Sequence, residues 1–336
     1  MLKNTIFTLN KRPEGIPDNN CWKLIDSSIR NIKKNEILIE NMYLSIDPYM
    51  RGRMNAGKSY APPVNIGEIM VGETLGRVVK SNSSKYLEGD LVCVHKGWQK
   101  YTLVKDNDLT LIKVPKTDIP ASVFLGALGM PGRTAFFGLT KVAKPNQSET
   151  VVISAASGAV GAVVTQLAKI YKCNVVGIAG GYEKCKYVTG TLGANNCIDY
   201  KNDDVLDKLH EYCPNGVDIY FENVGGDITR DISKVLNKNA RVPICGFISK
   251  YNSINIANEE TPFTVFKNMK NPPKHRFFVV REWAHQFKSA TKTLLNYMED
   301  GQLSYKETIT EGFENAPQAL RDVLSGKNFG KQLIKF

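Results

Sequence analysis

Residues 151–169 constrain the fold of this chain more than any other segment. A β-branched run at 151–154 leads into a turn of small residues, and apolar residues then recur at helical spacing from Gly161 onward. A strand that passes through such a turn into a helix presents backbone N–H groups and a positive helix end to a pyrophosphate. The segment therefore predicts a nucleotide-binding turn.

The turn departs in one place from the strict three-glycine fingerprint. Ala156 stands at the first position, while Gly158 and Gly161 stand at the second and third. The same pattern also occurs where a strand and a helix only pack closely. A second apolar run at 174–179, about twenty residues further on, completes a strand–helix–strand unit of the required length and favours the nucleotide site. The residues expected to contact the cofactor here are Ser157, Gly158, Ala159, Val160 and Gly161.

The 336 residues suffice for two domains. Residues 1–122 read as short strands separated by Gly, Pro, Asn and Ser clusters, which predicts an irregular, barrel-like β domain. Between 123 and 290 helical stretches alternate with apolar strands, which is typical of an α/β domain with a doubly wound parallel sheet. We expect residues 291–336 to return to the first domain.

The individual elements can be placed approximately. In the first domain, strands are expected at 36–44, 74–79, 90–95 and 99–104. In the α/β domain, they are expected at 151–154, 175–179, 197–198, 217–221, 240–245 and 277–280. In the tail, we expect helices near 289–298 and 315–324 and strands at 304–309 and 331–335.

Composition and charge exclude several classes of protein. The hydrophobic fraction of 42% and the charged fraction of 23% are ordinary for a globular protein. The net charge of +11 would suit nucleic acid, but the basic residues are dispersed, so we expect a solvated lysine-rich surface and no nucleic-acid partner. The positive electrostatic field of such a surface could still attract a multiply phosphorylated cofactor. No run approaches the ~20 apolar residues of a membrane span, and the first residues lack a secretory core, so we expect a cytoplasmic protein without membrane contact.

Cysteine and histidine spacing argues against a metal site. The seven cysteines form no Cys-x-x-Cys pair, and their odd number is typical of reduced thiols. The four histidines form no His-x-x-x-His pair or local Cys/His cluster. We therefore predict no metal ligands.

Four further motifs carry a family resemblance: residues 41–53 (NMYLSIDPYMRGR), 221–226 (FENVGG), 245–252 (CGFISKYN) and 326–331 (GKNFGK). With the nucleotide turn, they resemble the zinc-free branch of the medium-chain dehydrogenase/reductases, above all the prostaglandin reductases and alkenal double-bond reductases. Where zinc-bearing relatives have Gly-His-Glu, this chain has Gly72-Glu-Thr. The resemblance implies a GroES-like catalytic domain, a Rossmann domain that binds NADP, a homodimer, and reduction of the C=C bond of enals or enones by NADPH without a metal.

The choice of NADPH over NADH also follows from charge. An NAD site places a carboxylate at the end of the second strand, where it would repel a 2′-phosphate; here that strand ends at Gly180 and Gly181. By resemblance, Lys184 and Tyr200 contact the phosphate. The alternatives are a solvated helix lysine and a packing tyrosine.

Other residues are assigned to the cofactor by resemblance, each with a structural alternative. Asn223 follows a strand, at the sheet edge where dinucleotides bind, but Asn is also a common turn residue. Asn328 is expected near the nicotinamide, or else in a plain turn. The remaining candidates line the dinucleotide or belong to buried strands and loops: Cys245, Gly246, Phe247, Ile248, Ser249, Phe278, Val279 and Val280.

Tyr251 and Tyr49 are the candidate catalytic residues. Hydride transfer to the β-carbon places negative charge on the carbonyl oxygen, and without a metal that enolate needs a hydrogen-bond donor. By resemblance Tyr251 is that donor and a cofactor contact, and Tyr49 lies in the substrate cleft; both could instead be structural. We also expect Arg51 and Arg53 to pair with Asp47 or Glu73. Two other functions remain open: an NADPH-dependent quinone, alcohol or carbonyl oxidoreductase, and an NADPH-binding protein without turnover.

Overall fold

The computed structural model describes residues 2–57, 59–253 and 258–336, which form two compact units. Unit 1 consists of Met1–Gly126 and Glu307–Phe336, and unit 2 is the contiguous segment Ala127–Lys306. The sequence predicted these divisions near 122 and 290. The second boundary lies after Lys306 and not near 290, because the long helix α8 (Phe287–Glu299) packs against helix α2 (Met130–Phe137) of unit 2.

Unit 1 is built on antiparallel β-structure. A hairpin pairs β1 (Leu2–Leu9) with β2 (Trp22–Ile29), and a seven-stranded sheet has the order β14-β15-β3-β4-β5-β7, with β6 also paired to β3. The strands of this sheet are β3 (Glu36–Ser45), β4 (Thr74–Ser81), β5 (Leu91–Val94), β6 (Tyr101–Lys105), β7 (Ile112–Lys113), β14 (Glu307–Glu311) and β15 (Lys331–Lys335). The helices of unit 1 are α1 (Tyr49–Arg53) and α9 (Ala316–Leu324), and its 3₁₀ turns are Asn19–Cys21, Ala121–Leu125 and Phe313–Asn315.

The C-terminal strand completes this sheet. β15 pairs in parallel with β14 and antiparallel with β3, so the last residues lie beside a strand from the first fifty. Aromatic side chains join the same distant segments in the core, since the ring of Phe313 lies 5.0 Å from that of Phe7 and 4.9 Å from that of Phe336. These contacts assign the tail to unit 1.

Unit 2 contains a six-stranded parallel sheet in the order β10-β9-β8-β11-β12-β13. Its strands are β8 (Thr150–Ser154), β9 (Asn174–Ala179), β10 (Asn196–Asp199), β11 (Val217–Phe221), β12 (Leu236–Ile244) and β13 (Lys274–Phe277). Its other helices are α3 (Gly161–Ile170), α4 (Tyr182–Gly190), α5 (Val205–Tyr212), α6 (Asp227–Ser233) and α7 (Pro262–Lys267). A π-helical turn covers Gly138–Ala143, and 3₁₀ turns cover Ile248–Lys250 and Val280–Gln286.

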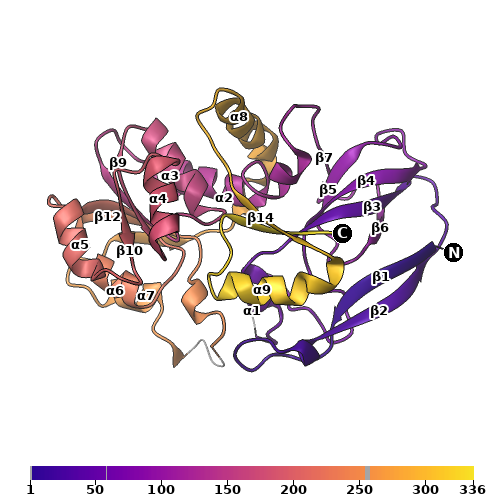
Figure 1. Ribbon diagram of the computed structural model, residues 1–336, viewed down its shortest axis with the longest axis horizontal. Coiled ribbons are helices and arrows are strands. Elements are labelled where there is room, and N and C mark those ends of the chain that lie inside the picture. Colours follow the sequence, from indigo (N-terminus) through magenta and orange to yellow (C-terminus); the bar gives the residue numbers. More distant parts are fainter. Residues whose placement is uncertain (1, 58, 254–257) are drawn as a thin grey trace. The chain divides into compact units, whose positions relative to one another are not determined.

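Helices cover both faces of this parallel sheet, as Figure 1 shows: α5, α6 and α7 lie on one face and α2, α3 and α4 on the other. On the first face Leu209, Ile232 and Phe266 are fully buried in one core with strand residues such as Val176. On the other face, a Cβ added at Gly177 would lie 2.6 Å from the Val188 side chain, so helix α4 can approach the sheet only over a glycine. A doubly wound sheet of this kind is the predicted fold.

One predicted strand is displaced. The sequence favoured a strand at 277–280, but β13 ends at Phe277 and a 3₁₀ turn begins at Val280. The backbone remains attached to the sheet at one point, where Phe278 N donates to Ile244 O at 3.3 Å. The apolar run Phe277–Val280 is therefore a strand end followed by a turn.

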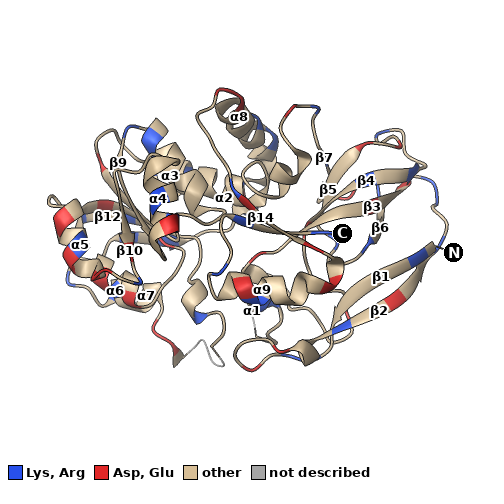
Figure 2. Ribbon diagram, viewed as in Figure 1, with Lys and Arg blue, Asp and Glu red and all other residues tan. Residues whose placement is uncertain are grey.

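Charged residues of both signs are interspersed along each unit (Figure 2). Lysines and arginines alternate with acidic residues, and exposed ion pairs such as Lys234 with Asp231 and Lys335 with Glu311 are common. In the part of the chain that the structure describes, no helix has the length and apolar character needed to cross a membrane.

Candidate cofactor and active site

The turn between β8 and α3 brings the backbone very close to itself. A Cβ on Gly161 would lie 2.2 Å from Ala155 O, so only glycine fits where the helix begins. Ala155 adopts a left-handed φ of 50°, and Ala156 N donates to Ile178 O on the neighbouring strand. Ser157 is buried, while Gly158, Ala159 and Val160, which directly precede the helix, are partly exposed. This exposed backbone is where an anion could approach the helix end.

The end of β9 forms a second close approach. A Cβ on Gly180 would lie 2.8 Å from the hydroxyl oxygen of Tyr200, so the tyrosine ring lies directly over this glycine. Gly181 has a φ of 98°, and its N–H donates to Asp199 Oδ1 at 2.7 Å. Asp199 also accepts from the backbone N–H of Lys201. This acid, which could have opposed a phosphate, is occupied by hydrogen bonds within its own turn.

Two lysines lie near these glycines. Lys184, in the first turn of α4, is half-buried, and its pKa is lowered by burial and by the positive charge of Lys201. Two cations that repel one another are stabilised when an anion binds between or beside them. Sequence reasoning identified Lys184 and missed Lys201, although Lys201 directly follows the candidate Tyr200.

Asn223 links the carboxyl ends of two strands. Its side-chain Nδ2 donates to Ser154 O at 2.7 Å, and its backbone N–H donates to Ser154 Oγ at 2.9 Å. The amide is thus held at the sheet edge between β8 and β11. Both the turn role and the edge position foreseen for this residue are compatible with these bonds.

The loop after β12 is bound to the same turn. Cys245 N donates to Glu222 O at 2.9 Å, Ile248 N to Asn223 O at 3.2 Å, and Ser249 N to Val224 O at 3.0 Å. Burial raises the pKa of the Cys245 thiol to about 12, so the thiol stays protonated near neutral pH. Cys245 and Ile248 bind this turn through their backbone, and Ser249 binds it through both its backbone N–H and its hydroxyl group, which donates to Val224 O at 2.6 Å.

Tyr251 follows in this loop with its hydroxyl group over another glycine. A Cβ on Gly246 would lie 2.7 Å from Tyr251 Oη, and the Tyr251 ring meets that of Phe247 edge-on at 5.8 Å. The phenol is half-buried. Within unit 2, the fold thus brings Asn223, the 245–249 loop and Tyr251 together.

The Phe278 region is mainly structural. Phe278 is 3% exposed, and its ring meets that of Phe221 edge-on at 6.1 Å. The Val279 N–H donates to Glu282 Oε1 at 2.8 Å, so this amide already has an acceptor. Val279 and Val280 remain partly exposed.

Tyr49 lies in unit 1, in the first turn of α1, and its hydroxyl oxygen is 2.9 Å from His95 Nε2. The two rings also stack, with centroids 6.2 Å apart. The pKa of Tyr49 lies well above its ordinary value, because burial and the negative charges of Asp47 and Glu73 disfavour the phenolate. Sequence reasoning missed His95, since nothing in its local pattern points to Tyr49.

The charge pairing near Tyr49 differs from the expected one. Asp47 forms its ion pair with Lys331, whose Nζ lies 2.9 Å from Asp47 Oδ1 with both side chains buried. Arg51 donates to Gly15 O and to Asn55 Oδ1. The partner of Asp47 is thus a lysine 284 residues away in sequence rather than one of the predicted arginines.

Asn328 occupies a turn just before β15. Its Nδ2 donates to Gly330 O at 2.8 Å, which corresponds to the plain turn role.

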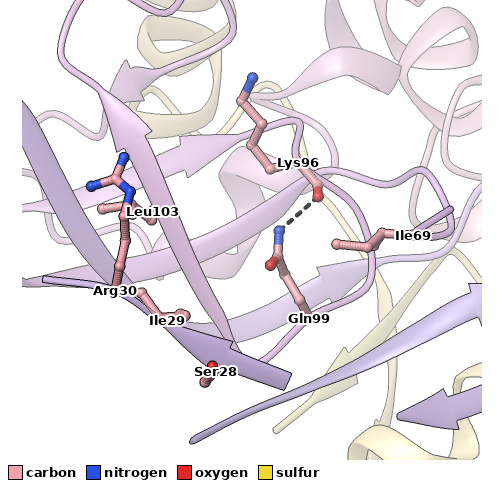
Figure 3. Close-up of a pocket in the computed structure, with 7 residues that line it drawn as sticks. All are labelled: Ser28, Ile29, Arg30, Ile69, Lys96, Gln99 and Leu103. Carbon is pink, nitrogen blue, oxygen red and sulfur yellow. Dashed lines mark hydrogen bonds between the residues drawn. The ribbon is translucent and has the colours of Figure 1, made fainter. Parts of the chain in front are cut away.

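A pocket of about 390 Å³ lies elsewhere on unit 1 (Figure 3). Figure 3 shows Gln99 in it, donating to Lys96 O at 2.8 Å. The lining residues are Ser28, Ile29, Arg30, Ile69, Lys96, Gln99 and Leu103, none of which is a candidate site residue. Across residues 2–57, 59–253 and 258–336, no group of three His, Cys, Asp or Glu side chains could hold a metal ion.

Comparison with known proteins identifies the family of this chain. Residues 6–112 match the family model described as the N-terminal domain of oxidoreductase, and residues 159–272 match the model described as zinc-binding dehydrogenase. The chain is 39% identical to NADPH-dependent curcumin reductase from Escherichia coli, over 99% of this chain and 97% of that protein. This chain belongs to the zinc-independent medium-chain dehydrogenase/reductases.

Two further medium-chain reductases extend the comparison. The 2-alkenal reductase (NADP⁺-dependent) from Nicotiana tabacum is 36% identical over 89% of this chain and 87% of its own length. The crystal structure of CurA in complex with NADPH, from Vibrio vulnificus, superposes with a TM-score of 0.92 at 38% identity and covers 98% of both chains. The two-domain fold of this branch, a β-rich domain and a Rossmann domain, is therefore the fold of this chain.

Proposed function

We propose that this protein reduces the C=C bond of α,β-unsaturated aldehydes and ketones with NADPH, by hydride transfer to the β-carbon. The observation that carries the proposal is end-to-end similarity to NADPH-dependent curcumin reductase, at 39% identity over 99% of the chain. The name of the tobacco relative adds 2-alkenals as a substrate class. The protein is an NADP-dependent oxidoreductase.

The residues of unit 2 fit an NADP dinucleotide. A Cβ on Gly161 would clash with Ala155 O, as in the tight strand-to-helix turn of a dinucleotide site, and a Cβ on Gly180 would clash with the Tyr200 ring. Ser157–Gly161 would face the pyrophosphate, and Lys184, Lys201 and Tyr200 would hold the 2′-phosphate. When bound, the reduced nicotinamide supplies the hydride.

The chemistry assigned to the protein is stabilisation of the enolate oxygen. We assign Tyr251 as the hydrogen-bond donor, because its hydroxyl lies in the loop that adjoins the candidate cofactor turn. A fixed donor to a developing oxyanion contributes about 2.7–4 kcal/mol to the barrier reduction. Tyr49 is assigned to substrate binding in unit 1. Asn223 and the backbone of Cys245, Gly246, Phe247, Ile248 and Ser249 are assigned to the nicotinamide half, with Phe278, Val279 and Val280 at its border.

The decisive assay compares a conjugated enone with its saturated ketone. NADPH oxidation is followed at 340 nm, and the product is identified by mass spectrometry. We expect oxidation with the enone, a product in which only the C=C bond is reduced, and no turnover of the saturated ketone. A chelator is expected to leave the rate unchanged.

Other outcomes of this assay would identify the alternatives. Turnover of the saturated ketone would indicate an alcohol or carbonyl oxidoreductase, and turnover of a quinone alone would indicate a quinone reductase. NADPH binding with no turnover across a panel of enones would indicate a protein that binds the cofactor without catalysing a reaction.

Assembly and location are part of the same proposal. We propose a homodimer, as the family resemblance implies. All seven cysteines are free thiols, which suits the reducing cytoplasm. Light scattering coupled to size-exclusion chromatography should give twice the chain mass of 37.4 kDa, and a monomer would contradict the dimer.

A further inference from the structure

A buried carboxylate lies at the centre of unit 2. Glu222 follows β11 directly and is 0% exposed. Among the described residues no lysine, arginine or histidine forms an ion pair with it, and burial raises its pKa. Burying a carboxylate without a cation is costly, so its hydrogen bonds must account for its presence.

Five donors converge on the two oxygens of Glu222. Oε1 accepts from Val224 N at 2.8 Å, from Gly225 N at 2.9 Å and from Tyr220 Oη at 2.9 Å, with Ser154 Oγ farther away at 3.4 Å. Oε2 accepts from the hydroxyl of Thr229, in helix α6. The side chain thus binds the backbone of the turn directly after it, and this turn contains Asn223.

The turn needs such support because its backbone is unusual. Gly225 and Gly226 have φ angles of 78° and 67°, in the left-handed region. A Cβ on Gly225 would lie 2.9 Å from the Cβ of Phe247, so the turn and the following loop are in close contact. Two N–H donors bound to one carboxylate oxygen fix this conformation.

The same turn carries the loop of Tyr251. Val224 O accepts from both Ser249 N and Ser249 Oγ, and Asn223 O accepts from Ile248 N. The 3₁₀ turn Ile248–Lys250 leads directly to Tyr251, whose N–H donates to Ile248 O. Hydrogen bonds and the intervening backbone therefore connect the Glu222 carboxylate to the turn that contains Asn223 and to the loop of Tyr251.

We propose that Glu222 is a positioning residue for the reaction: its carboxylate holds the Asn223–Gly226 turn, and through it the Tyr251 loop, in the geometry that binds NADPH. The proposal rests on the proposed function, because it assumes that this turn and loop face the cofactor. Glu222 itself does not touch substrate or cofactor.

The test compares three variants. Glu222→Met removes every acceptor at similar volume, and we expect the Kd for NADPH to rise at least tenfold and kcat to fall at least tenfold. Glu222→Gln can keep its Oε1 oxygen toward Val224 N and Gly225 N while its amide faces the Thr229 hydroxyl, so we expect Kd and kcat within about threefold of wild type. Tyr220→Phe removes a donor to the same oxygen but leaves the turn bonds, so it should lower the thermal midpoint without changing Kd more than threefold.

Binding is measured by NADPH fluorescence titration, and folding by near-UV circular dichroism. A folded Glu222→Met protein with wild-type Kd and kcat would overturn the proposal. So would a Tyr220→Phe protein that loses affinity as strongly as Glu222→Met, because the effect would then follow stability alone. Failure of the wild-type protein to bind NADPH would instead contradict the proposed function.

Hydrogen exchange on the wild-type protein covers the case in which Glu222→Met does not fold. We expect the amides of Val224 and Gly225 to exchange slowly although they lie in a turn. Rapid exchange of these two amides, as in a solvent-bonded loop, would overturn the proposal without any variant.

Discussion

The hydroxyl oxygen of Tyr49 lies 2.9 Å from Nε2 of His95, a residue 46 positions later in the chain. Both side chains are half-buried in unit 1, and burial together with Asp47 and Glu73 raises the pKa of the phenol well above its usual range. Tyr49 therefore stays neutral near neutral pH, and its bond to His95 Nε2 fixes the position of the hydroxyl group.

The first prediction concerns this pair. His95→Gln keeps a hydrogen-bonding group of similar reach, whereas His95→Leu does not, so we expect KM for an enone to rise about three- to tenfold in His95→Leu and to change less in His95→Gln. The KM for NADPH should be unaffected, because unit 2 supplies the proposed cofactor contacts. Steady-state kinetics with both substrates varied provides the measurement. Equal KM values for the enone in wild type, His95→Gln and His95→Leu would show that His95 does not contribute to substrate binding.

The second prediction concerns cofactor choice. Lys184→Ala removes a cation from the proposed phosphate site, and a charge-assisted hydrogen bond of about 1.5–3 kcal/mol corresponds to a 10- to 100-fold higher KM for NADPH. NADH lacks the phosphate, so its KM should barely change. Lys186→Ala, an exposed lysine on the same helix, is the matched control. Equal losses for both cofactors would refute the phosphate contact.

The third prediction concerns the proposed enolate donor. Tyr251→Phe should lower kcat about 10²- to 10³-fold while the Kd for NADPH stays within about threefold, because the ring and its contact with Phe247 are kept. Single-turnover mixing of the NADPH-loaded protein with an enone isolates the hydride step. Full activity in this variant would move the donor role to another group.

A fourth prediction addresses the buried ion pair of unit 1. Lys331→Met leaves Asp47 buried without its cation, and breaking such a pair costs about 3–5 kcal/mol. Denaturant unfolding of the protein, followed by tryptophan fluorescence, measures the loss. Lys335 lies on the same strand as Lys331 and forms an exposed ion pair with Glu311. The control variant Lys335→Met should therefore leave the free energy of unfolding nearly unchanged. An equally small effect at Lys331 would contradict the role we assign to the pair.

A fifth prediction concerns a buried thiol of unit 2. Burial raises the pKa of Cys213 from 9.0 to about 11. A raised pKa favours the folded state fully below the unfolded value, and this contribution is lost as the pH rises from about 9 to 11. Alkaline unfolding of Cys213→Ala should therefore depend less steeply on pH in that window than wild type, as measured by denaturant midpoints at each pH. Identical slopes would show that other groups account for the alkaline loss.

The sequence predicted the sheet of unit 2 well because its signals are local. The apolar run 174–179 became β9, and the small-residue turn at 155–161 led into α3 as expected. The β1 and β2 hairpin was not singled out, because polar residues such as Asn4 and Asp26 interrupt its apolar pattern. Where an apolar run ended in a turn, at Phe277–Val280, periodicity alone could not separate the strand from the turn.

The site was predictable only where one motif contains both partners. Glu222 and Asn223 lie in the same hexapeptide, residues 221–226. An acidic residue directly after an apolar strand could have indicated a buried carboxylate, but the sequence analysis did not single out Glu222. By contrast, Asp47 meets Lys331 across 284 positions, and Tyr49 meets His95 across two elements. Such pairs arise from tertiary packing, and the local sequence around either residue does not indicate its partner.

The pairing of β15 between β14 and β3 has a consequence for synthesis of the protein. The sheet of unit 1 lacks two strands until residues 307–335 have left the ribosome, whereas unit 2 is contiguous and has all of its strands once Lys306 is made. Domains that become available first during translation generally fold first. The nucleotide-binding half should therefore mature early, and the amino-terminal half must wait, with the Tyr43–Ser45 end of β3 lacking one neighbour, for the final strand to arrive.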